Sequence, residues 1–211
     1  MIFVALVGKS NSGKSTAATV VAEMLGEEGC EAYQWAFADP IKNIVREAFN
    51  LNWYDVNTQD GKASTYPTTY GLTSRELLQK VGTDLFRRGL KDTLWVDNLV
   101  TRCGIAEEQY VREILAPQDD SPPPPMPVNI ITDMRELVEY EGLSGHDLFT
   151  IYLTRDVKSS ASNGHSSEAL FEAPFDIVID NQTSSPEVFE SQIREVVPQI
   201  LSWLGERNAR Y

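Results

Sequence analysis

A glycine-rich segment near the start of the chain constrains the fold more than any other feature. Residues 8–15 read GKSNSGKS and match the phosphate-binding pattern G-x-x-x-x-G-K-[ST]. Residues 2–7 are all apolar and predict a buried strand, and residues 16–25 predict a helix. A strand, a glycine loop and a helix in this order form the setting in which the pattern binds phosphate. The alternative interpretation is a turn that binds nothing.

Two side chains of this loop suit a bound phosphate chain. The glycines allow backbone N–H groups to surround an anion, and the positive end of the following helix dipole adds to the attraction. Lys14 would reach the β- and γ-phosphates, and the Ser15 hydroxyl would hold Mg²⁺. The loop therefore predicts a nucleotide-phosphate site.

Length and composition limit the class of protein. A chain of 211 residues suits one domain, with or without a small lid. No apolar run approaches the roughly 18 residues that cross a bilayer, and no leader peptide is visible, so we expect no membrane partner. Cys30 and Cys103 lack the spacing of a disulfide framework or a zinc site, which favours a reducing, cytoplasmic location.

The charge balance bears on the kind of ligand. The chain has 18 basic and 31 acidic residues, a formal net charge of −13. Long nucleic acid is therefore not an expected partner, because its binding requires a basic stripe. A phosphorylated small molecule remains compatible, since a few Arg and Lys side chains and a metal ion suffice to hold it.

Strands and helices alternate along the chain, which predicts an α/β fold. The pattern is typical of three αβα layers, with about five parallel strands between helices on both faces. The predicted strands are 2–7, 31–37, 128–133, 148–153 and 176–180. After the first helix, the predicted helices are 40–49, 73–88, 94–103, 106–115, 136–141 and 185–204, the last of which is expected to stop at Gly205.

Three segments fall outside this alternation. Residues 51–72 are polar, aromatic and turn-rich and are interpreted as an insertion or loop near the acceptor site. Residues 117–127 hold four consecutive prolines and predict an exposed, extended loop, which favours a spacer over a partner-recognition motif. Residues 155–174 are mostly small and polar, as in a closing lid, although an ordinary surface loop is the alternative.

The helix predicted at 73–88 has a defined start. Thr73 and Glu76 form a capping-box pattern at its beginning. Leu77, Val81 and Leu85 follow at helical spacing, together with Leu78, and would line its inner face.

Polar residues gather where the predicted strands end. Gly8, Asp39, Asp133 and Arg155 each follow a strand, so in a parallel sheet they should share one cleft. Asp133 could hold Mg²⁺ directly or through water. Its alternative role is the N-cap of the helix at 136–141.

Three arginines could supply the positive charge that phosphoryl transfer needs. Arg135 could pair with a phosphate, or with Glu139 as a surface ion pair. Arg75 lies in the first turn of a helix, where the dipole disfavours a cation unless an anion is bound nearby. Arg155, at the start of the lid segment, could bring charge to the transferring group. His165 alone is weak evidence for acid–base catalysis.

Several motifs in order resemble the deoxynucleoside monophosphate kinases of tailed bacteriophages, within the P-loop nucleoside monophosphate kinase-like fold. The resemblance covers most of the chain, and its more specific part is the pairing of Phe-Ala-Asp-Pro with a later His-x-Ser-Glu. The Pro-rich segment matches no motif of the family. The matching segments are 8–16, 37–42, 75–84, Trp95, 132–135 with Glu139, Arg155, 165–168 and 176–181.

The resemblance implies transfer of the ATP γ-phosphate to a deoxynucleoside 5′-monophosphate, with Mg²⁺ held by Ser15 and Asp133. Lys14, Arg135 and Arg155 would be catalytic, and Asn181 and Gln182 would lie near the adenine. The location would be the host cytoplasm if the chain is viral, and a homodimer is left open. In the resemblance Asp39 faces either the acceptor or the metal, and Glu168 either contacts the acceptor or caps the next turn. The resemblance implies ATP contacts from Gly8, Asn11, Ser12, Gly13, Lys14, Ser15 and Thr16, and acceptor contacts from Asp39, Arg75, Arg135, His165, Ser167 and Glu168.

Two other functions compete with this one. Dephospho-coenzyme A kinases share the glycine loop and a similar last strand, so another small-molecule kinase is the nearest alternative. A non-kinase ATPase or switch is the second, although no Gln or Glu stands in a clear water-positioning context.

Overall fold

The computed structural model describes residues 1–114, 127–155, 173–182 and 185–208. The chain divides into two compact units, Met1–Ala36 with Leu99–Tyr211 and Phe37–Asn98, and each is described separately. The expected single domain over residues 1–211 stays a prediction.

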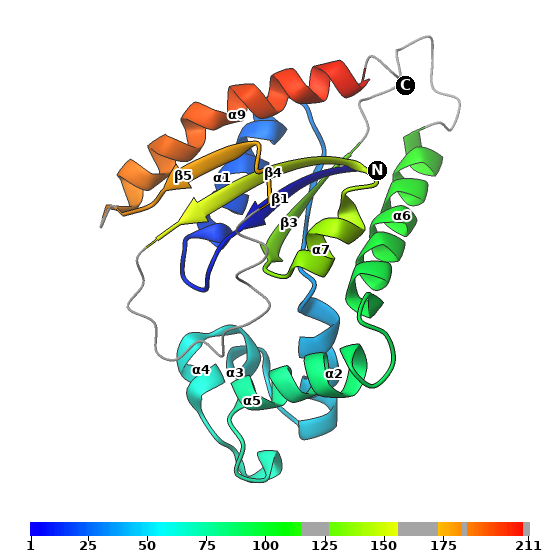
Figure 1. Cartoon of the computed structure of the whole chain (residues 1–211), viewed down its shortest axis with the longest axis vertical. Coiled ribbons are helices and arrows are strands. Elements are labelled where there is room, and N and C mark those ends of the chain that lie inside the picture. The colour runs from blue at the N-terminus through cyan, green and yellow to red at the C-terminus, as the bar shows by residue number, and fades with distance from the viewer. Residues whose placement is uncertain (115–126, 156–172, 183–184, 209–211) are drawn as a thin grey trace. The chain divides into compact units, whose positions relative to one another are not determined.

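The first unit is built on a parallel sheet of five strands in the order β2-β3-β1-β4-β5 (Figure 1). The central strand β1 is buried along its whole length, as its apolar sequence predicts. This arrangement confirms the predicted α/β class and each of the five strands. Their bounds are β1 Ile2–Val7, β2 Ala32–Trp35, β3 Val128–Met134, β4 Asp147–Thr154 and β5 Ile177–Asp180.

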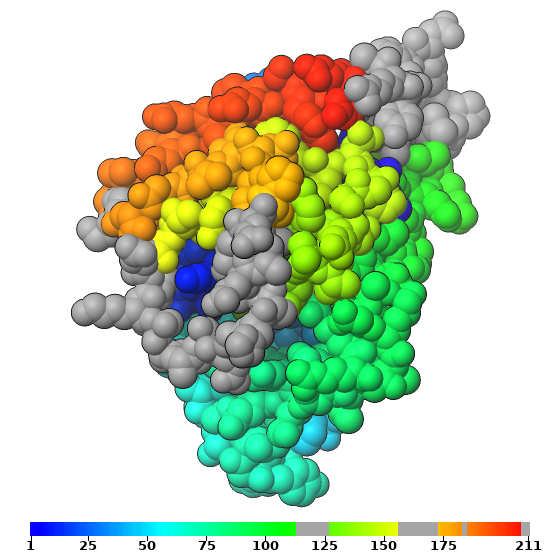
Figure 2. Space-filling model, viewed as in Figure 1, coloured from blue at the N-terminus to red at the C-terminus, as the bar shows by residue number. Residues whose placement is uncertain are grey.

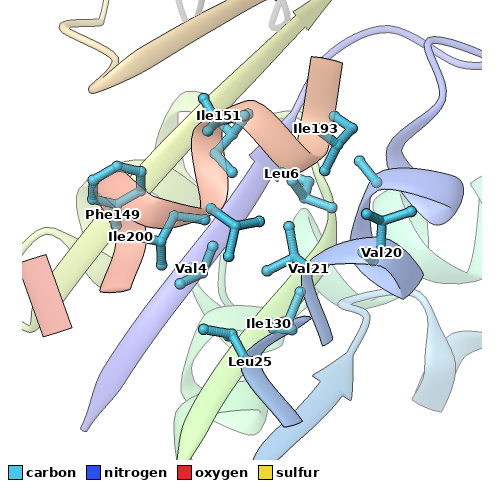
Figure 3. Close-up of a cluster of buried hydrophobic side chains, with 14 of the residues drawn as sticks. Val4, Leu6, Val20, Val21, Leu25, Ile130, Phe149, Ile151, Ile193 and Ile200 are labelled. Atoms are coloured by element: carbon cyan, nitrogen blue, oxygen red, sulfur yellow. The ribbon is translucent and has the colours of Figure 1, made fainter. Parts of the chain in front are cut away.

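Helices cover both faces of this sheet, completing the αβα layers. On one face, α1 Lys14–Glu27 and α9 Pro186–Asn208 pack on β1, β3 and β4 in a shared apolar core (Figure 3). On the other face lie α7 Leu137–Leu143 and the part of α6 that follows Asn98. The side chain of Asn129 in β3 donates to Glu107 of α6 at 3.0 Å, which fixes α6 to that face.

The shared core explains why α1 holds its place under the glycine loop. Leu25 of α1, Leu6 of β1 and Ile193 of α9 are all fully buried. Burying such a side chain contributes about 1.5–3 kcal/mol relative to leaving it in water. The start of α1, which carries the loop residues, is thereby anchored to the middle of the sheet.

The second unit, Phe37–Asn98, is helical and has a small apolar core of Val45, Leu51, Val56, Leu77 and Val81. Its short helices begin at polar caps. Examples are Asn52, whose side chain accepts from the Asp55 N–H at 3.3 Å, and the predicted Thr73–Glu76 capping box, which is confirmed. The helices are α2 Asp39–Phe49, α3 Trp53–Asn57, α4 Gln59–Ala63, η1 Pro67–Thr69, α5 Ser74–Gln79 and η2 Lys80–Arg87, followed by the start of α6.

The structure corrects four sequence predictions. Residues 51–72 are not a plain loop, because α3, α4 and η1 form there. The two helices predicted at 94–103 and 106–115 are one continuous helix, α6 Leu94–Ile114, which passes through Gly104. Leu85 is 63% exposed because η2 is a π-helix, whose wider turn moves this residue off the inner face. Helix α9 continues past Gly205 to Asn208.

Candidate phosphate-binding site

The glycine loop leaves β1 at Gly8 and enters α1 at Lys14. Both framing glycines have backbone conformations that favour glycine, with φ of +148° at Gly8 and +100° at Gly13. A Cβ on Gly8 would lie 2.6 Å from the carbonyl oxygen of Leu153, so β4 leaves no room for a side chain. The pattern glycines are thus required by the fold of this loop as well as by the motif.

The loop lies at the surface. Residues 9–11 are exposed, and in Figure 2 the beginning of the chain (blue) reaches the surface beside the end of β4 (yellow). Ser15 and Thr16, at the start of α1, are exposed as well. A ligand can therefore reach the start of α1, where the first N–H groups of the helix have no intrahelical acceptor.

Lys14 is the one loop cation held inward. It is 6% exposed, and its Nζ donates to the carbonyl oxygens of Gly8 at 2.8 Å and Lys9 at 2.7 Å. Burial and, after it, the charge of Arg135 lower the Lys14 pKa, and the charge of Asp133 raises it, so that together they bring it from 10.5 to about 7. A bound anion would oppose both lowering effects, so this lysine is arranged for a negatively charged ligand.

Asp133 stands at an irregularity of β3. Strands β1 and β3 pair in register up to Ala5 and Ile131, but Val7 pairs with Met134, one residue further than that register predicts. The extra residue falls at positions 132–133, and such bulges redirect side chains at functional edges. Asp133 is half-buried and close enough to Lys14 to affect its pKa. It does not cap α7, whose N-cap is Glu136.

Arg135 and Arg155 add two cations around the loop. Arg135 is exposed and contributes to the lowered pKa of Lys14. Glu139 accepts from the backbone N–H of Arg135 at 2.7 Å, so these two residues are in contact through the Arg135 backbone. The guanidinium of Arg155, just after β4, donates to the carbonyl oxygen of Asn11 at 3.4 Å. Four of the predicted site residues are thus brought together, Lys14, Asp133, Arg135 and Arg155.

The side chain of Asn181 lies against the glycine loop, and its predicted place near an adenine stays a prediction. It is 3% exposed, and its Nδ2 donates to the carbonyl oxygen of Ser12 at 2.9 Å across 169 positions of sequence. Ser12, whose predicted contact with ATP stays a prediction, is fully buried. The sequence signal for this contact is an amide directly after the last strand, at the sheet edge where the loop also lies.

The oxygen donors near Lys14 fit a metal ion that arrives with its ligand. Mg²⁺ is usually held by one or two protein oxygens together with substrate phosphates and water. The Ser15 hydroxyl and the Asp133 carboxylate supply such a pair. No group of three or more His, Cys, Asp or Glu side chains that could hold a metal occurs among the described residues.

The remaining predicted site residues lie elsewhere. Asp39 begins α2 in the second unit, and its Oδ1 lies 3.5 Å from Nζ of Lys42. Because Gly8 belongs to the first unit, the predicted cleft shared by Asp39 and Gly8 stays a prediction. Arg75 lies in the first turn of α5 and donates to Gln59 at 2.8 Å, a contact that the dipole argument did not foresee. His165, Ser167, Glu168 and most of the lid 155–174 and of the Pro-rich segment 117–127 lie outside the described residues.

Comparison with known proteins gives one curated relative of note. The chain is 38% identical over 88 residues to a protein of Acanthamoeba polyphaga mimivirus that is provisionally named a deoxynucleotide monophosphate kinase. The match covers 41% of this chain and 43% of that protein, so the chain spans less than half of this relative. No family model matches the chain.

Solved structures with a similar arrangement are distant in sequence. The match with thymidylate kinase from Candida albicans covers 96% of this chain and 93% of the kinase chain, at 14% identity and with a TM-score of 0.44. An APS kinase of Mycobacterium tuberculosis, in complex with AMPPNP and APS, covers 97% of both chains at 14% identity, with a TM-score of 0.39. At these scores the likeness supports no statement about activity. Separately, none of the described helices has the length and hydropathy of a transmembrane span.

Proposed function

We propose that this protein is an ATP-dependent kinase that phosphorylates deoxynucleoside 5′-monophosphates to diphosphates. The observation that carries the proposal is the buried Lys14, folded into a glycine loop with Arg135 and Asp133 close enough to shift its pKa. The mimivirus relative supports the choice of acceptor, since its name gives a deoxynucleotide monophosphate kinase. A bacteriophage origin stays a prediction.

The proposed reaction moves one phosphoryl group between two phosphates. An oxygen of the acceptor monophosphate attacks the γ-phosphorus, the bond between that phosphorus and the β,γ-bridging oxygen breaks, and ADP leaves. The attacking oxygen is already anionic, so no side chain has to remove a proton from it. The chain has only to position the two phosphates and to neutralise charge on the transferring oxygens.

Each cation of the site has a place in this scheme. Lys14 would hold the β- and γ-phosphates, where its charge is favoured by the anion. Arg135 and Arg155 would bring positive charge to the acceptor phosphate and to the transferring group. Mg²⁺ bound to ATP would be held by Ser15 and Asp133 and would offset charge on the phosphate oxygens. Asp39, Arg75 and the 165–168 segment are proposed for the acceptor side.

An acceptor panel tests the proposal. ADP formation from Mg·ATP would be measured with dGMP, dTMP, dAMP, dCMP, the four ribonucleotides and dephospho-coenzyme A. We expect stimulation by one or more deoxynucleoside monophosphates, and the pattern gives the base range. Stimulation by dephospho-coenzyme A alone would assign the chain to the competing kinase class. Slow ATP loss that is indifferent to every acceptor would indicate an ATPase or a switch.

A further inference from the structure

The glycine loop is in contact with Asn181 and Phe189, two residues that follow it by more than 160 positions in the sequence. Asn181 follows β5, and its backbone N–H donates to the Thr154 carbonyl oxygen at 2.9 Å, which extends the pairing of β5 with β4. Its side chain then reaches the Ser12 carbonyl oxygen at 2.9 Å. Because a carbonyl oxygen only accepts, the amide nitrogen of Asn181 must face it.

This single hydrogen bond sets the orientation of the peptide between Ser12 and Gly13. In a trans peptide the C=O and the N–H point in opposite directions within one plane. With the Ser12 oxygen held by Asn181, the Gly13 N–H points away from Asn181. Among the described residues this N–H has no acceptor, so it is free to bind an anion in the loop.

The same peptide is also confined by packing. A Cβ on Gly13 would lie 2.7 Å from the ring of Phe189 in α9 and 2.8 Å from Nδ2 of Asn181. The ring and the amide therefore press closely on this side of the loop. Glycine tolerates a wide range of backbone angles and offers no side chain for these groups to hold, so packing alone does not fix the orientation of the peptide, and the hydrogen bond from Asn181 adds that constraint.

We propose that Asn181 is a positioning residue that keeps the Gly13 N–H turned toward bound phosphate. Without its amide, the Ser12–Gly13 peptide can turn over and present the Ser12 carbonyl oxygen to the ligand, which repels a phosphate. The inference rests on the proposed binding of a nucleotide in the loop and adds a residue that acts through the Ser12–Gly13 peptide.

The test compares ADP binding by three variants of the whole chain. Calorimetry with Mg·ADP would give dissociation constants for the native chain, Asn181→Ala and Asp180→Ala. Asp180 is the matched control, because it is the neighbouring residue, is exposed, and accepts from the Thr154 hydroxyl at 2.8 Å without touching the loop. Thermal unfolding without ligand would show whether each variant folds.

We expect Asn181→Ala to weaken ADP binding by about ten- to a hundredfold, the effect of losing one buried hydrogen bond. Asp180→Ala should bind within about twofold of the native chain, since an exposed contact contributes little. In turnover, the KM for ATP should rise more than the KM for the acceptor. If Asn181→Ala fails to fold, Asn181→Asp keeps the volume and removes the donor, and we expect at least the same loss.

Unchanged ADP binding in a folded Asn181 variant would overturn the inference, as would an equal loss in Asp180→Ala. Failure of the proposed function looks different. A native chain that binds ADP but transfers no phosphate would refute the kinase and leave the role of Asn181 to be decided by the same binding constants. A native chain that binds no ADP would overturn both.

Discussion

The two compact units use different means to hold their helices. The sheet unit has a core of twenty buried apolar residues between β-strands and two long helices, whereas the Phe37–Asn98 unit has a core of five. In the smaller unit, several short helices depend on side-chain caps such as Asn52, Thr58 and Thr73. The large core of the sheet unit holds the glycine loop in place. The small core of the Phe37–Asn98 unit, with its many helix caps, should allow this unit to unfold locally at a lower free energy.

The two units also differ in whether their buried or capping polar residues serve ligand binding or folding stability. Lys14 is a buried ionisable group in the sheet unit, so keeping its ammonium form there costs folding free energy, and a bound anion would offset that cost. The caps of the smaller unit, by contrast, are explained by the helices they begin. The predictions below test this division, from the largest expected effect to the smallest.

Lys14→Met should abolish most activity without unfolding the chain. We expect the acceptor-dependent kcat/KM to fall by about a thousandfold or more, because the phosphate oxygens lose a preorganised cation. The melting temperature should not fall, since an apolar side chain replaces a buried ammonium group. Lys91→Met is the control, because Lys91 is an exposed partner of Asp97 in the other unit. Native-like turnover by Lys14→Met would refute the assignment of the loop.

Core truncations should affect the two units unequally. Leu25→Ala, in the large core, is expected to cost about 2–5 kcal/mol of unfolding free energy. Leu77→Ala, in the small core, should cost less, because the sparse surroundings can relax around the missing atoms. Hydrogen exchange should show Leu77→Ala exposing amides of residues 37–98 while the strand amides stay protected. Equal loss of protection in both units would contradict the comparison.

The buried charge of Lys14 should also make stability depend on pH. Its pKa is about 7 in the folded chain and ordinarily 10.5, so between these values the unfolded chain binds more protons. Stability without ligand should therefore rise with pH in this window, by at most about 1.4 kcal/mol per pH unit from this group. Urea unfolding at pH 7 and pH 9 measures it, and Lys14→Met should show a smaller rise than the native chain. Identical slopes would show that Lys14 is not desolvated.

The smallest expected effect is the loss of a single cap. Thr73→Ala removes the side chain that accepts from the Glu76 N–H at 3.2 Å and should cost about 1 kcal/mol. Urea unfolding measures the change, and Thr68→Ala is the control because Thr68 is an exposed residue of η1. A loss below about 0.3 kcal/mol would mean that this helix start is held by packing instead.

The sheet unit was predicted from the sequence more accurately than the helical unit, because its strands and its glycine loop are encoded by residues that are close together in the sequence. Strands such as β1 are continuous apolar runs, and the order of strand, loop and helix around Lys14 is a local motif. The prediction that Leu85 lines the inner face of its helix was wrong, because the spacing rule assumes an α-helix and this segment is a π-helix with a wider turn. The short helices α3 and α4 were missed because their caps, and not an apolar periodicity, define them.

In the candidate site too, features encoded locally were predicted, and contacts between residues distant in the sequence were not. Gly8, Asp133 and Arg155 lie at predicted strand ends, so topology alone suggested that they share one cleft, whereas the same prediction for Asp39 stays untested. The contact between Asn181 and Ser12 depends on side-chain geometry across 169 positions, which no local pattern records. The bulge at Asp133 likewise comes from the pairing of two distant strands, β1 and β3.

The most direct test of the account follows the phosphate itself. The chain would be incubated with γ-labelled ATP, Mg²⁺ and each deoxynucleoside monophosphate, and the products would be separated by chromatography. The account predicts label in a deoxynucleoside diphosphate, formed by the native chain and not by Lys14→Met. Label released only as inorganic phosphate, at the same rate with and without acceptor, would contradict the central claim that this loop serves a nucleotide kinase.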